Sequence, residues 1–222
     1  MSERHLEIFF DSLLPLLKAG VAFTIPLAII SFVLGITLAL FTALARLSNL
    51  KPLVKLAQFY VWVIRGTPLL VQLFIIFYGL PRVGVTLDAF PSAVIGFTLS
   101  VGAYASETIR AAILSISKGQ WEAAYSLGMT RGQALRRTIL PQATRVAIPS
   151  LSNSFISLVK DTSLAATITV TEVFQTAQQI TAVTYEPMIL YVEAALIYLI
   201  MSSVLSYAQS RLEKYNDRYH AR

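Results

Sequence analysis

Long stretches of apolar, uncharged residues alternate with short charged segments along the whole chain. The clearest stretch covers residues 19–45 and is followed by Arg46. As a helix rising about 1.5 Å per residue, it is longer than the roughly 30 Å thickness of a bilayer's hydrocarbon core. Further spans are expected at about residues 59–79, 91–113, 146–161 and 187–208. The pattern therefore predicts an all-α, polytopic membrane protein with five transmembrane helices, built as a single domain over residues 1–222.

The composition supports a membrane protein and narrows its chemistry. Hydrophobic residues make up 55% and charged residues 14% of the chain, and the mean hydropathy is +0.64. Soluble domains are about 25% charged. Cysteine is absent, and the two histidines, His5 and His220, lie near the chain ends. Thiolate or histidine catalysis and a metal site are therefore not expected.

The basic residues are distributed unevenly between the two sides of the expected membrane. Fourteen of the 18 Lys and Arg residues fall in segments 46–65, 110–145 and 209–222, which the five-span pattern places on one side. Cytoplasmic segments carry an excess of Lys and Arg. We therefore expect a protein of the bacterial cytoplasmic (inner) membrane, with its N-terminus outside and its C-terminus in the cytoplasm. This orientation, in contact with membrane lipid, explains the net charge of +6 better than nucleic-acid binding does.

The longest cytoplasmic segment, residues 117–141, carries the start and stop signals of two short helices. Residues 117–120 and 130–133 both have the Ser/Thr-x-x-Gln spacing of a capping box. Gly128 is placed to end the first helix in the left-handed conformation. Pro141 is expected to stop the second helix, because proline cannot continue the helical hydrogen-bond pattern.

The first of these two helices has an apolar side, formed by Trp121, Ala124 and Tyr125 at helical spacing. Such an element fits a docking site for another protein. It also fits a helix that lies on the anionic surface of the membrane. On physical grounds both interpretations stay open.

The loop resembles a motif of a known transporter family. Residues 122–124 (Glu-Ala-Ala), Gly128 and residues 139–141 (Ile-Leu-Pro) resemble the EAA loop of ATP-binding-cassette (ABC) importer permeases. In that family the loop forms a coupling helix, which sits in a cleft of the ATPase subunit. The resemblance implies the MetI-like permease fold of type I importers, with an EAA coupling loop at about residues 117–141. The ATPase-coupling residues would be Trp121, Glu122, Ala123, Ala124 and Gly128.

Other segments resemble one branch of that family. Residues 59–73, 103–110 and 152–165 are similar to the polar amino-acid permeases, and residues 120–124 and 154–163 look most like L-cystine permeases. The resemblance therefore implies import of a polar amino acid, with L-cystine as the first expectation, fed by an extracytoplasmic amino-acid-binding protein.

The energy source must lie outside this chain. A phosphate-binding Walker A loop ends in Gly-Lys-Ser/Thr, and the sequence contains no Gly-Lys pair. The chain is thus expected to be a transport subunit and not an enzyme, with no cofactor of its own. ATP and Mg would be bound by a dimer of ABC ATPase subunits. Because five helices are too few to line a gated path, we expect a second permease copy, preferably in a homodimer. A heterodimer with a similar permease remains open.

Charged residues inside the expected spans are the first candidates for a substrate site, because such groups are costly in a membrane. The ammonium group of a free amino acid needs an acceptor. Glu107 is one candidate, with an i,i+3 ion pair to Arg110 as the structural alternative. Asp161 is the other, and a helix-end pair with Lys160 near the outer surface is its structural alternative.

Residues at two possible helix breaks complete the candidate set. Thr162 and Ser163 are good N-cap residues, and a new half-helix starting there could bind a substrate carboxylate. Pro68 frees a backbone carbonyl that could accept a substrate ammonium, or simply be satisfied by Thr67 or water. Tyr104, Leu69 and Lys160, in the segments that carry the resemblance, are the remaining candidates for substrate contact.

An ATP-independent secondary carrier or channel is the alternative from another class. Glu107 and Glu193 would then be proton-coupling groups. The two classes differ in whether an ATPase partner responds to a substrate-loaded binding protein.

Overall fold

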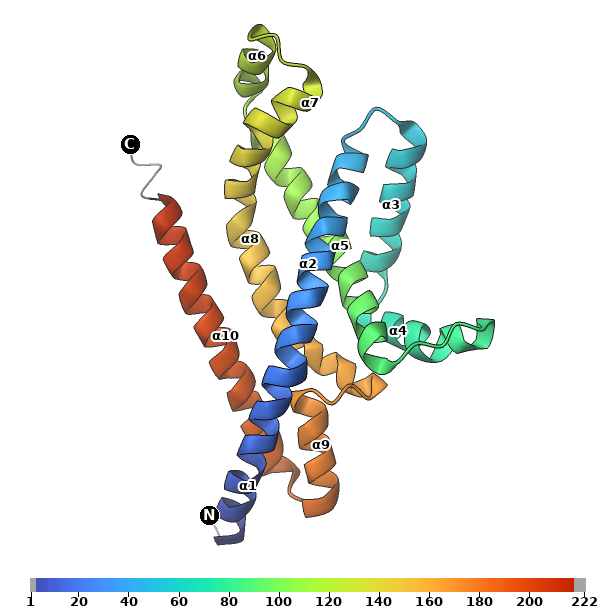
Figure 1. Cartoon of the computed structure of the whole chain (residues 1–222), viewed down its shortest axis with the longest axis vertical. Helices are drawn as coiled ribbons and strands as arrows, with labels where there is room; N and C mark the ends of the chain where they lie inside the picture. The colour runs from blue at the N-terminus through green and yellow to red at the C-terminus, as the bar shows by residue number, and fades with distance from the viewer. Residues whose placement is uncertain (1–2, 218–222) are drawn as a thin grey trace.

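The structure, a computed structural model, describes residues 3–217 as a bundle of helices and their connections (Figure 1). The long helices are α1 (Glu3–Ala19), α2 (Ile25–Arg46), α3 (Lys51–Gly66), α5 (Ala89–Ser115), α8 (Leu140–Asp161), α9 (Val173–Thr184) and α10 (Pro187–Asp217). The short ones are α4 (Leu69–Phe74), α6 (Lys118–Ser126) and α7 (Arg131–Ala134). Five tighter or wider helical turns are η1 (Gly20–Thr24), η2 (Ile75–Gly79), η3 (Leu80–Val83), η4 (Leu135–Ile139) and η5 (Thr162–Ile168). The prediction of an all-α fold is confirmed.

The core lies where α2, α5 and α8 pack together along the long axis of the molecule. Its fully buried side chains include Leu27 of α2 and Phe97 of α5. α2 and α5 approach closely because Gly35 of α2 faces Val101 of α5. A Cβ atom at Gly35 would lie 2.5 Å from Cγ1 of Val101, far inside van der Waals contact.

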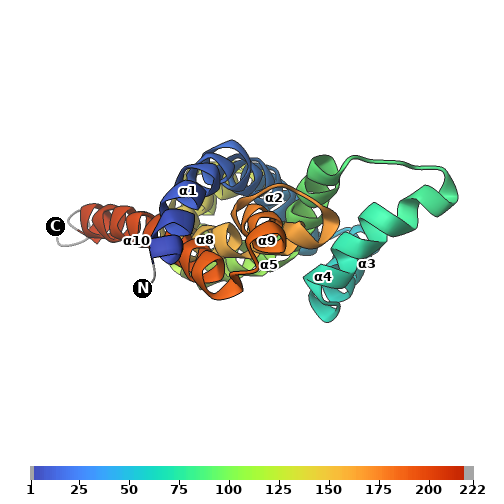
Figure 2. The same ribbon diagram turned by 90° about the horizontal axis from the view of Figure 1, so that it is seen from below.

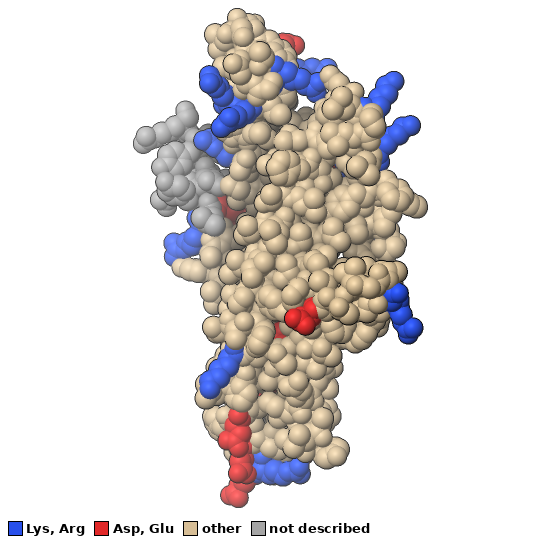
Figure 3. All heavy atoms as spheres, turned by 45° about the vertical axis from the view of Figure 1, so that its right-hand side comes forward, with Lys and Arg blue, Asp and Glu red and all other residues tan. Residues whose placement is uncertain are grey.

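The two ends of the molecule are built differently. The helices α6 and α7 form one end, and α1, α9 and the start of α10 form the other (Figure 1). Seen from below, α4 and the turns after it extend sideways from the bundle as an arm (Figure 2). On the face shown in Figure 3, Lys and Arg gather at the end with α6 and α7, and the middle is largely uncharged. This matches the charge asymmetry on which the predicted orientation rests.

Among residues 3–217, three helical stretches are long and apolar enough to cross a membrane, namely residues 3–46, 89–115 and 187–211. A fourth arises if the bent pair α3–α4 counts as one span. The segment expected as the remaining span lies in α8, which has 22 residues and includes Arg145, Lys160 and Asp161. By length and composition the structure thus has three or four spans, and the number five stays a prediction.

The second expected span is not one helix. α3 ends at Gly66, α4 starts at Leu69, and the two axes meet at 104°. Pro68 cannot donate a backbone hydrogen bond, and its ring disfavours a helical conformation at Thr67, which is extended (φ −121°, ψ 145°). The expectation of a continuous helix over residues 59–79 is therefore wrong.

The expectation that Pro141 ends a helix is also wrong. The helix runs without interruption from α7 through η4 into α8, and Pro141 lies in the first turn of α8. The turn before it is a π-helix, in which the N–H of Leu140 bonds the carbonyl of Leu135. Proline normally clashes with the carbonyl four residues earlier, here that of Arg137 inside the widened turn. Pro26 and Pro81 likewise follow the π-turns η1 and η2.

No new half-helix starts at Thr162 or Ser163, contrary to expectation. The chain passes from α8 directly into the 3₁₀ turn η5, and both residues keep helical geometry. Their hydroxyl groups donate backwards to carbonyls, from Thr162 to Val159 at 2.7 Å and from Ser163 to Lys160 at 2.8 Å. The break comes later, at Thr169, which has a left-handed φ of 67°.

Candidate functional site

The coupling loop ends its first helix as the sequence predicts. Gly128 has a left-handed φ of 76°. Its N–H bonds the carbonyl of Tyr125, and the N–H of Met129 bonds the carbonyl of Ala124. These two bonds form a Schellman motif, which closes the C-terminal end of α6. Nothing lies within 4 Å of a Cβ at Gly128, so the requirement for glycine comes from the backbone alone.

Of the two predicted capping boxes, the structure forms one and lacks the other. Thr130 and Gln133 form the complete box at the start of α7, each side chain bonding the other's backbone N–H. Ser117 occupies the N-cap position of α6, but its side chain makes no cap hydrogen bond. The second box is confirmed and the first is wrong.

The helix α6 presents two different surfaces. Ala124 is buried and Trp121 packs on the core, so these residues hold α6 to the protein. Tyr125, which the sequence places on the same side as those residues, is instead exposed, as are Glu122 and Ala123. Leu127 is 78% exposed at the tip of the molecule. The outward surface therefore combines a carboxylate with exposed aromatic and aliphatic groups.

A side chain of α7 ties this end of the molecule to the corner between α2 and α3. One guanidinium nitrogen of Arg131 donates to the carbonyl of Leu47 at 2.9 Å, and the other donates to Oδ1 of Asn49 at 3.0 Å. Arg46, the last residue of α2, directly precedes this corner.

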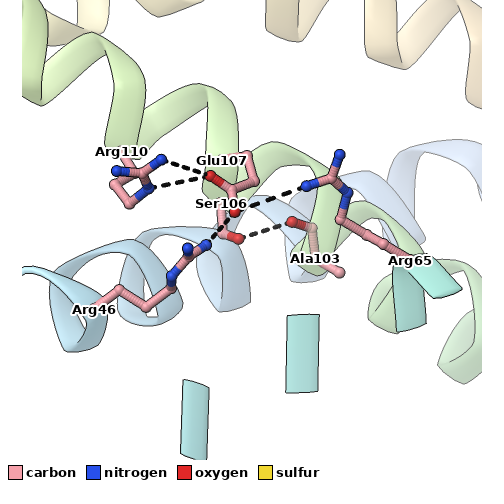
Figure 4. A network of polar contacts seen from close by, with 6 residues as sticks. All are labelled: Arg46, Arg65, Ala103, Ser106, Glu107 and Arg110. Carbon is pink, nitrogen blue, oxygen red and sulfur yellow. Dashed lines mark hydrogen bonds and ion pairs between the residues drawn. The ribbon is translucent and has the colours of Figure 1, made fainter. Parts of the chain in front are cut away.

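Glu107 lies within a cluster of three arginines from three helices (Figure 4). Arg110 of the same helix lies 3.1 Å from Oε2, as the sequence alternative predicts. Arg46 of α2 donates to Oε1, and a guanidinium nitrogen of Arg65 of α3 lies 3.7 Å from the same oxygen. The side chains of Glu107 and Arg46 are only 25% and 15% exposed. Formally, the cluster carries three positive charges and one negative charge.

The cluster shows what sequence spacing could not find. Arg46 and Arg65 are far from Glu107 along the chain, and only helix packing brings them to it. The positive excess favours an anion at this place over an ammonium group, because like charges repel strongly where solvent is scarce. A role for Glu107 as acceptor of a substrate ammonium stays a prediction, and the arrangement does not favour it.

A cavity of about 520 Å³ lies between α5 and α8, beside the start of α4. Asp161, Tyr104 and Leu69, three of the predicted substrate residues, line it together. The other polar side chains of its wall are Ser100, Ser150, Asn153, Ser154 and Ser157. The cavity thus offers one carboxylate, several neutral hydrogen-bonding groups and an apolar wall. Lys160, Thr162 and Ser163 adjoin Asp161 in sequence but are not part of this lining.

The carbonyl that would accept a hydrogen bond from an N–H at position 68 is satisfied by a side chain that the sequence analysis missed. Nε2 of Gln72 donates to the carbonyl of Ile64 at 2.8 Å, which is the acceptor that an N–H at position 68 would use in a helix. It also lies 3.1 Å from the carbonyl of Thr67 and 2.9 Å from its Oγ1. A glutamine four residues after a proline inside an apolar span is a signal that could have indicated this bond.

Glu172 is a second residue that sequence reasoning missed. It is fully buried and caps α9, accepting a hydrogen bond from the N–H of Gln175 at 2.7 Å and another from Tyr198 of α10. The available signal was its charge, because no other residue between Asp161 and Glu186 is charged. Glu193, for which the sequence suggested only proton coupling in an ATP-independent carrier, is buried in α10, and its Oε2 lies 2.5 Å from the hydroxyl of Ser12 in α1.

A helical membrane bundle with an EAA-type loop at one end and a cavity between α5 and α8 that contains a carboxylate and several hydroxyl groups is typical of a transporter subunit. Residues 35–217 match the profile of the binding-protein-dependent transport system inner membrane components. The chain belongs to this family. It is therefore a permease subunit of an ABC importer in the bacterial inner membrane, a transport component and not an enzyme.

Named relatives lie in the amino-acid branch. The chain is 58% identical to the L-cystine transport system permease protein TcyB of Bacillus subtilis (strain 168), over 97% of this chain and 93% of that protein. It is 36% identical to the arginine transport system permease protein ArtQ of the same organism, over 90% of this chain and 92% of that one. The resemblance to ABC permeases of amino-acid importers is thereby confirmed.

Solved structures agree with the fold. The chain superposes with a TM-score of 0.82 on a structure described as an amino acid ABC transporter with histidines, at 36% identity over 96% of this chain and 95% of that one. An inward-facing structure of the MetNI methionine ABC transporter gives a TM-score of 0.70 at 19% identity, over 97% of this chain and 99% of that one, and shows the fold alone. The predicted MetI-like fold is confirmed, and membership of the family removes the alternative of an ATP-independent carrier.

The Glu107 cluster generates a stability prediction. Glu107→Gln should lower the melting temperature of the purified permease, because three guanidinium groups lose their shared carboxylate. A hydrogen bond to a charged group contributes about 1.5–3 kcal/mol. Arg110→Gln should cost less, since Arg46 and Arg65 remain beside Glu107.

The double variant Glu107→Gln, Arg110→Gln separates two structural interpretations. If Arg110 were the main partner, removing both charges would restore the wild-type melting temperature. We expect no restoration, because Arg46 and Arg65 still lack their carboxylate. Full recovery in a thermal unfolding assay would contradict the three-arginine cluster.

Proposed function

We propose that this permease moves a polar amino acid, with L-cystine as the first candidate, through the cavity between α5 and α8. The observation that carries the proposal is the meeting of Asp161, Tyr104 and Leu69 in one cavity of about 520 Å³. The importer would take its substrate from an extracytoplasmic amino-acid-binding protein. A pair of ATPase subunits, which bind ATP and Mg, would supply the energy.

The cavity suits a zwitterion of amino-acid size. The Asp161 carboxylate, exposed to the cavity, can accept hydrogen bonds from an ammonium group. Ser and Asn side chains on the facing walls supply neutral donors, and Leu69 supplies apolar surface. Lys160, Thr162, Ser163 and Pro68 remain secondary candidates, since each directly adjoins a residue of the lining.

The relatives support the substrate class more strongly than the particular substrate. The names of relatives at 58% and 37% identity refer to L-cystine, while others refer to arginine and nopaline. All of these are amino acids or amino-acid derivatives with polar groups at both ends. L-Cystine is therefore the first ligand to test.

The assembly and the orientation are part of the same proposal. We expect a homodimer of permeases, with a heterodimer of similar permeases as the alternative. The N-terminus would lie outside and the C-terminus in the cytoplasm, which directs α6 and α7 toward the ATPases. The exposed Glu122, Ala123, Tyr125 and Leu127 would then contact the ATPase cleft, with Trp121, Ala124 and Gly128 fixing the shape of α6.

Transport itself is tested with the permease co-expressed with its ATPase and reconstituted in proteoliposomes. L-Cystine-loaded binding protein should stimulate ATP hydrolysis, and radiolabelled L-cystine should enter the vesicle compartment. Asp161→Asn should reduce uptake by about 10- to 150-fold, which corresponds to one lost charged hydrogen bond. Asp88→Asn, an exposed carboxylate outside the cavity, is the matched control and should transport normally. Wild-type uptake by Asp161→Asn would remove this residue from the site.

The coupling loop predicts a second defect, in which ATP hydrolysis and uptake are separated. Gly128→Val should reach the membrane in normal amount yet fail to transport, because a β-branched residue at φ 76° is strained by about 1–3 kcal/mol. Gly132→Val adds the same group to an open position of α7 whose φ is not left-handed, and should retain transport. Equal uptake by the two variants would contradict the assignment of the loop.

The orientation can be measured directly, because the chain contains no cysteine. Val83→Cys, at a residue 74% exposed near the end of the α4 arm, should react with a membrane-impermeant thiol reagent in intact cells. Leu127→Cys should react only after the membrane is opened. The reverse labelling pattern would invert the proposed topology.

A further inference from the structure

The arginine cluster borders a second cavity, which is separate from the one that contains Asp161. This cavity has a volume of about 410 Å³, and its polar lining comes from Arg46, Arg65, Glu107, Gln58 and Tyr104. Its remaining walls are the α3 residues Val61, Trp62 and Gly66. Within the described part of the chain, Glu107 is the only acid that lines it. The electrostatic potential in this cavity is therefore positive.

Arg65 is the one arginine of the cluster that makes no hydrogen bond to Glu107. Its closest approach to Glu107, 3.7 Å, is too long for a hydrogen bond, and its side chain is 44% exposed. Among the described residues, no hydrogen-bond acceptor lies within reach of its five N–H donors. The guanidinium is held in place instead by the ring of Tyr104, whose centroid lies 5.2 Å from its central carbon. An oriented guanidinium with free donors matches the planar, two-oxygen geometry of a carboxylate.

The two cavities meet at Tyr104, which lines both. The α5 residues of the first cavity are Ser100, Val101, Tyr104 and Ala105. Those of the second are Tyr104 and Glu107, which reach about one turn nearer to α6. Arg46 in the second cavity is the last residue of α2, next to the corner that contacts α7. The order along the molecule is therefore the Asp161 cavity, then Tyr104, then the arginine cavity, then the coupling end.

We propose that Arg65 binds the carboxylate of the transported amino acid as it passes from the Asp161 cavity toward the coupling end. The inference rests on the proposed function and extends it. Asp161 offers an acceptor for the ammonium group, and the arginine cavity offers free donors and positive charge for the carboxylate. Glu107 keeps the excess charge low enough that the anion is released.

The experiment compares amino acids with their amides, which keep the ammonium but lose the carboxylate. The wild-type permease–ATPase complex in nanodiscs, without nucleotide or binding protein, is titrated with radiolabelled L-cystine and L-cystine diamide. L-Arginine and L-argininamide form a second pair. We expect the acid to bind more tightly than the amide, and Arg65→Gln to reduce that ratio by about 10- to 100-fold.

Two further variants make the result specific. Arg65→Lys keeps the charge but loses the two-pronged geometry, so its ratio should be intermediate. If Arg65→Gln fails to assemble, as judged by size-exclusion chromatography, Arg65→Lys provides the test on its own. Arg82→Gln, an exposed arginine in η3, is the control and should leave the ratio unchanged. An unchanged acid-to-amide ratio in both Arg65 variants would overturn the proposal.

An anionic lipid headgroup has the same charge as the substrate carboxylate and must be distinguished from it. The titrations are therefore repeated in nanodiscs with and without phosphatidylglycerol. An effect of Arg65→Gln that disappears without this lipid assigns the site to lipid and overturns the proposal. If the wild-type complex binds none of the four compounds, the proposed function fails together with the inference. Binding by the wild type with an unaltered ratio in the variants overturns the inference alone.

Discussion

A backbone N–H or carbonyl group in the interior of a bilayer finds no water, so the groups freed at every interruption of a helix there must be satisfied by a hydrogen-bonding partner from the protein. The shape of this molecule depends on how it meets that requirement. At the sharp bend between α3 and α4, the Gln72 amide replaces the missing N–H of Pro68. At the entry to α9, the buried Glu172 accepts the N–H of Gln175. Pro26, Pro81 and Pro141 follow widened π-turns, through which the helical backbone continues. Because each break is closed locally, the helices can change direction in the core and leave cavities beside the bends.

The charged groups of the interior follow a similar logic. Glu107 is surrounded by guanidinium groups from α2, α3 and α5, so one carboxylate holds three helices together (Figure 4). A single ion pair would be neutral, whereas this cluster retains a positive excess. That excess lies one turn from Tyr104, on the far side of which Asp161 contributes a negative charge. The two cavities therefore carry charges of opposite sign on either side of one aromatic ring. This polarity suits a substrate that is itself a zwitterion.

The coupling end is connected physically to this interior. Arg131, at the start of α7, bonds the corner after α2 through Leu47 and Asn49. The preceding residue, Arg46, contacts Glu107. A displacement of α6 and α7 by an ATPase partner would have to carry this corner with it or break these bonds.

The sequence by itself determined the class of protein. Apolar stretches and the bias of Lys and Arg predicted an all-α membrane protein, and Gly128 predicted a helix end, because helical periods and left-handed glycines are local properties of the chain. The resemblance of residues 122–141 to the EAA loop then identified an ABC permease. The sequence also pointed to Asp161, Tyr104 and Leu69, though not to the cavity that unites them. The tertiary structure decided the rest. Arg46 and Arg65 reach Glu107 only because α2 and α3 pack beside α5. No spacing rule reports such contacts, because they depend on which helices become neighbours in space.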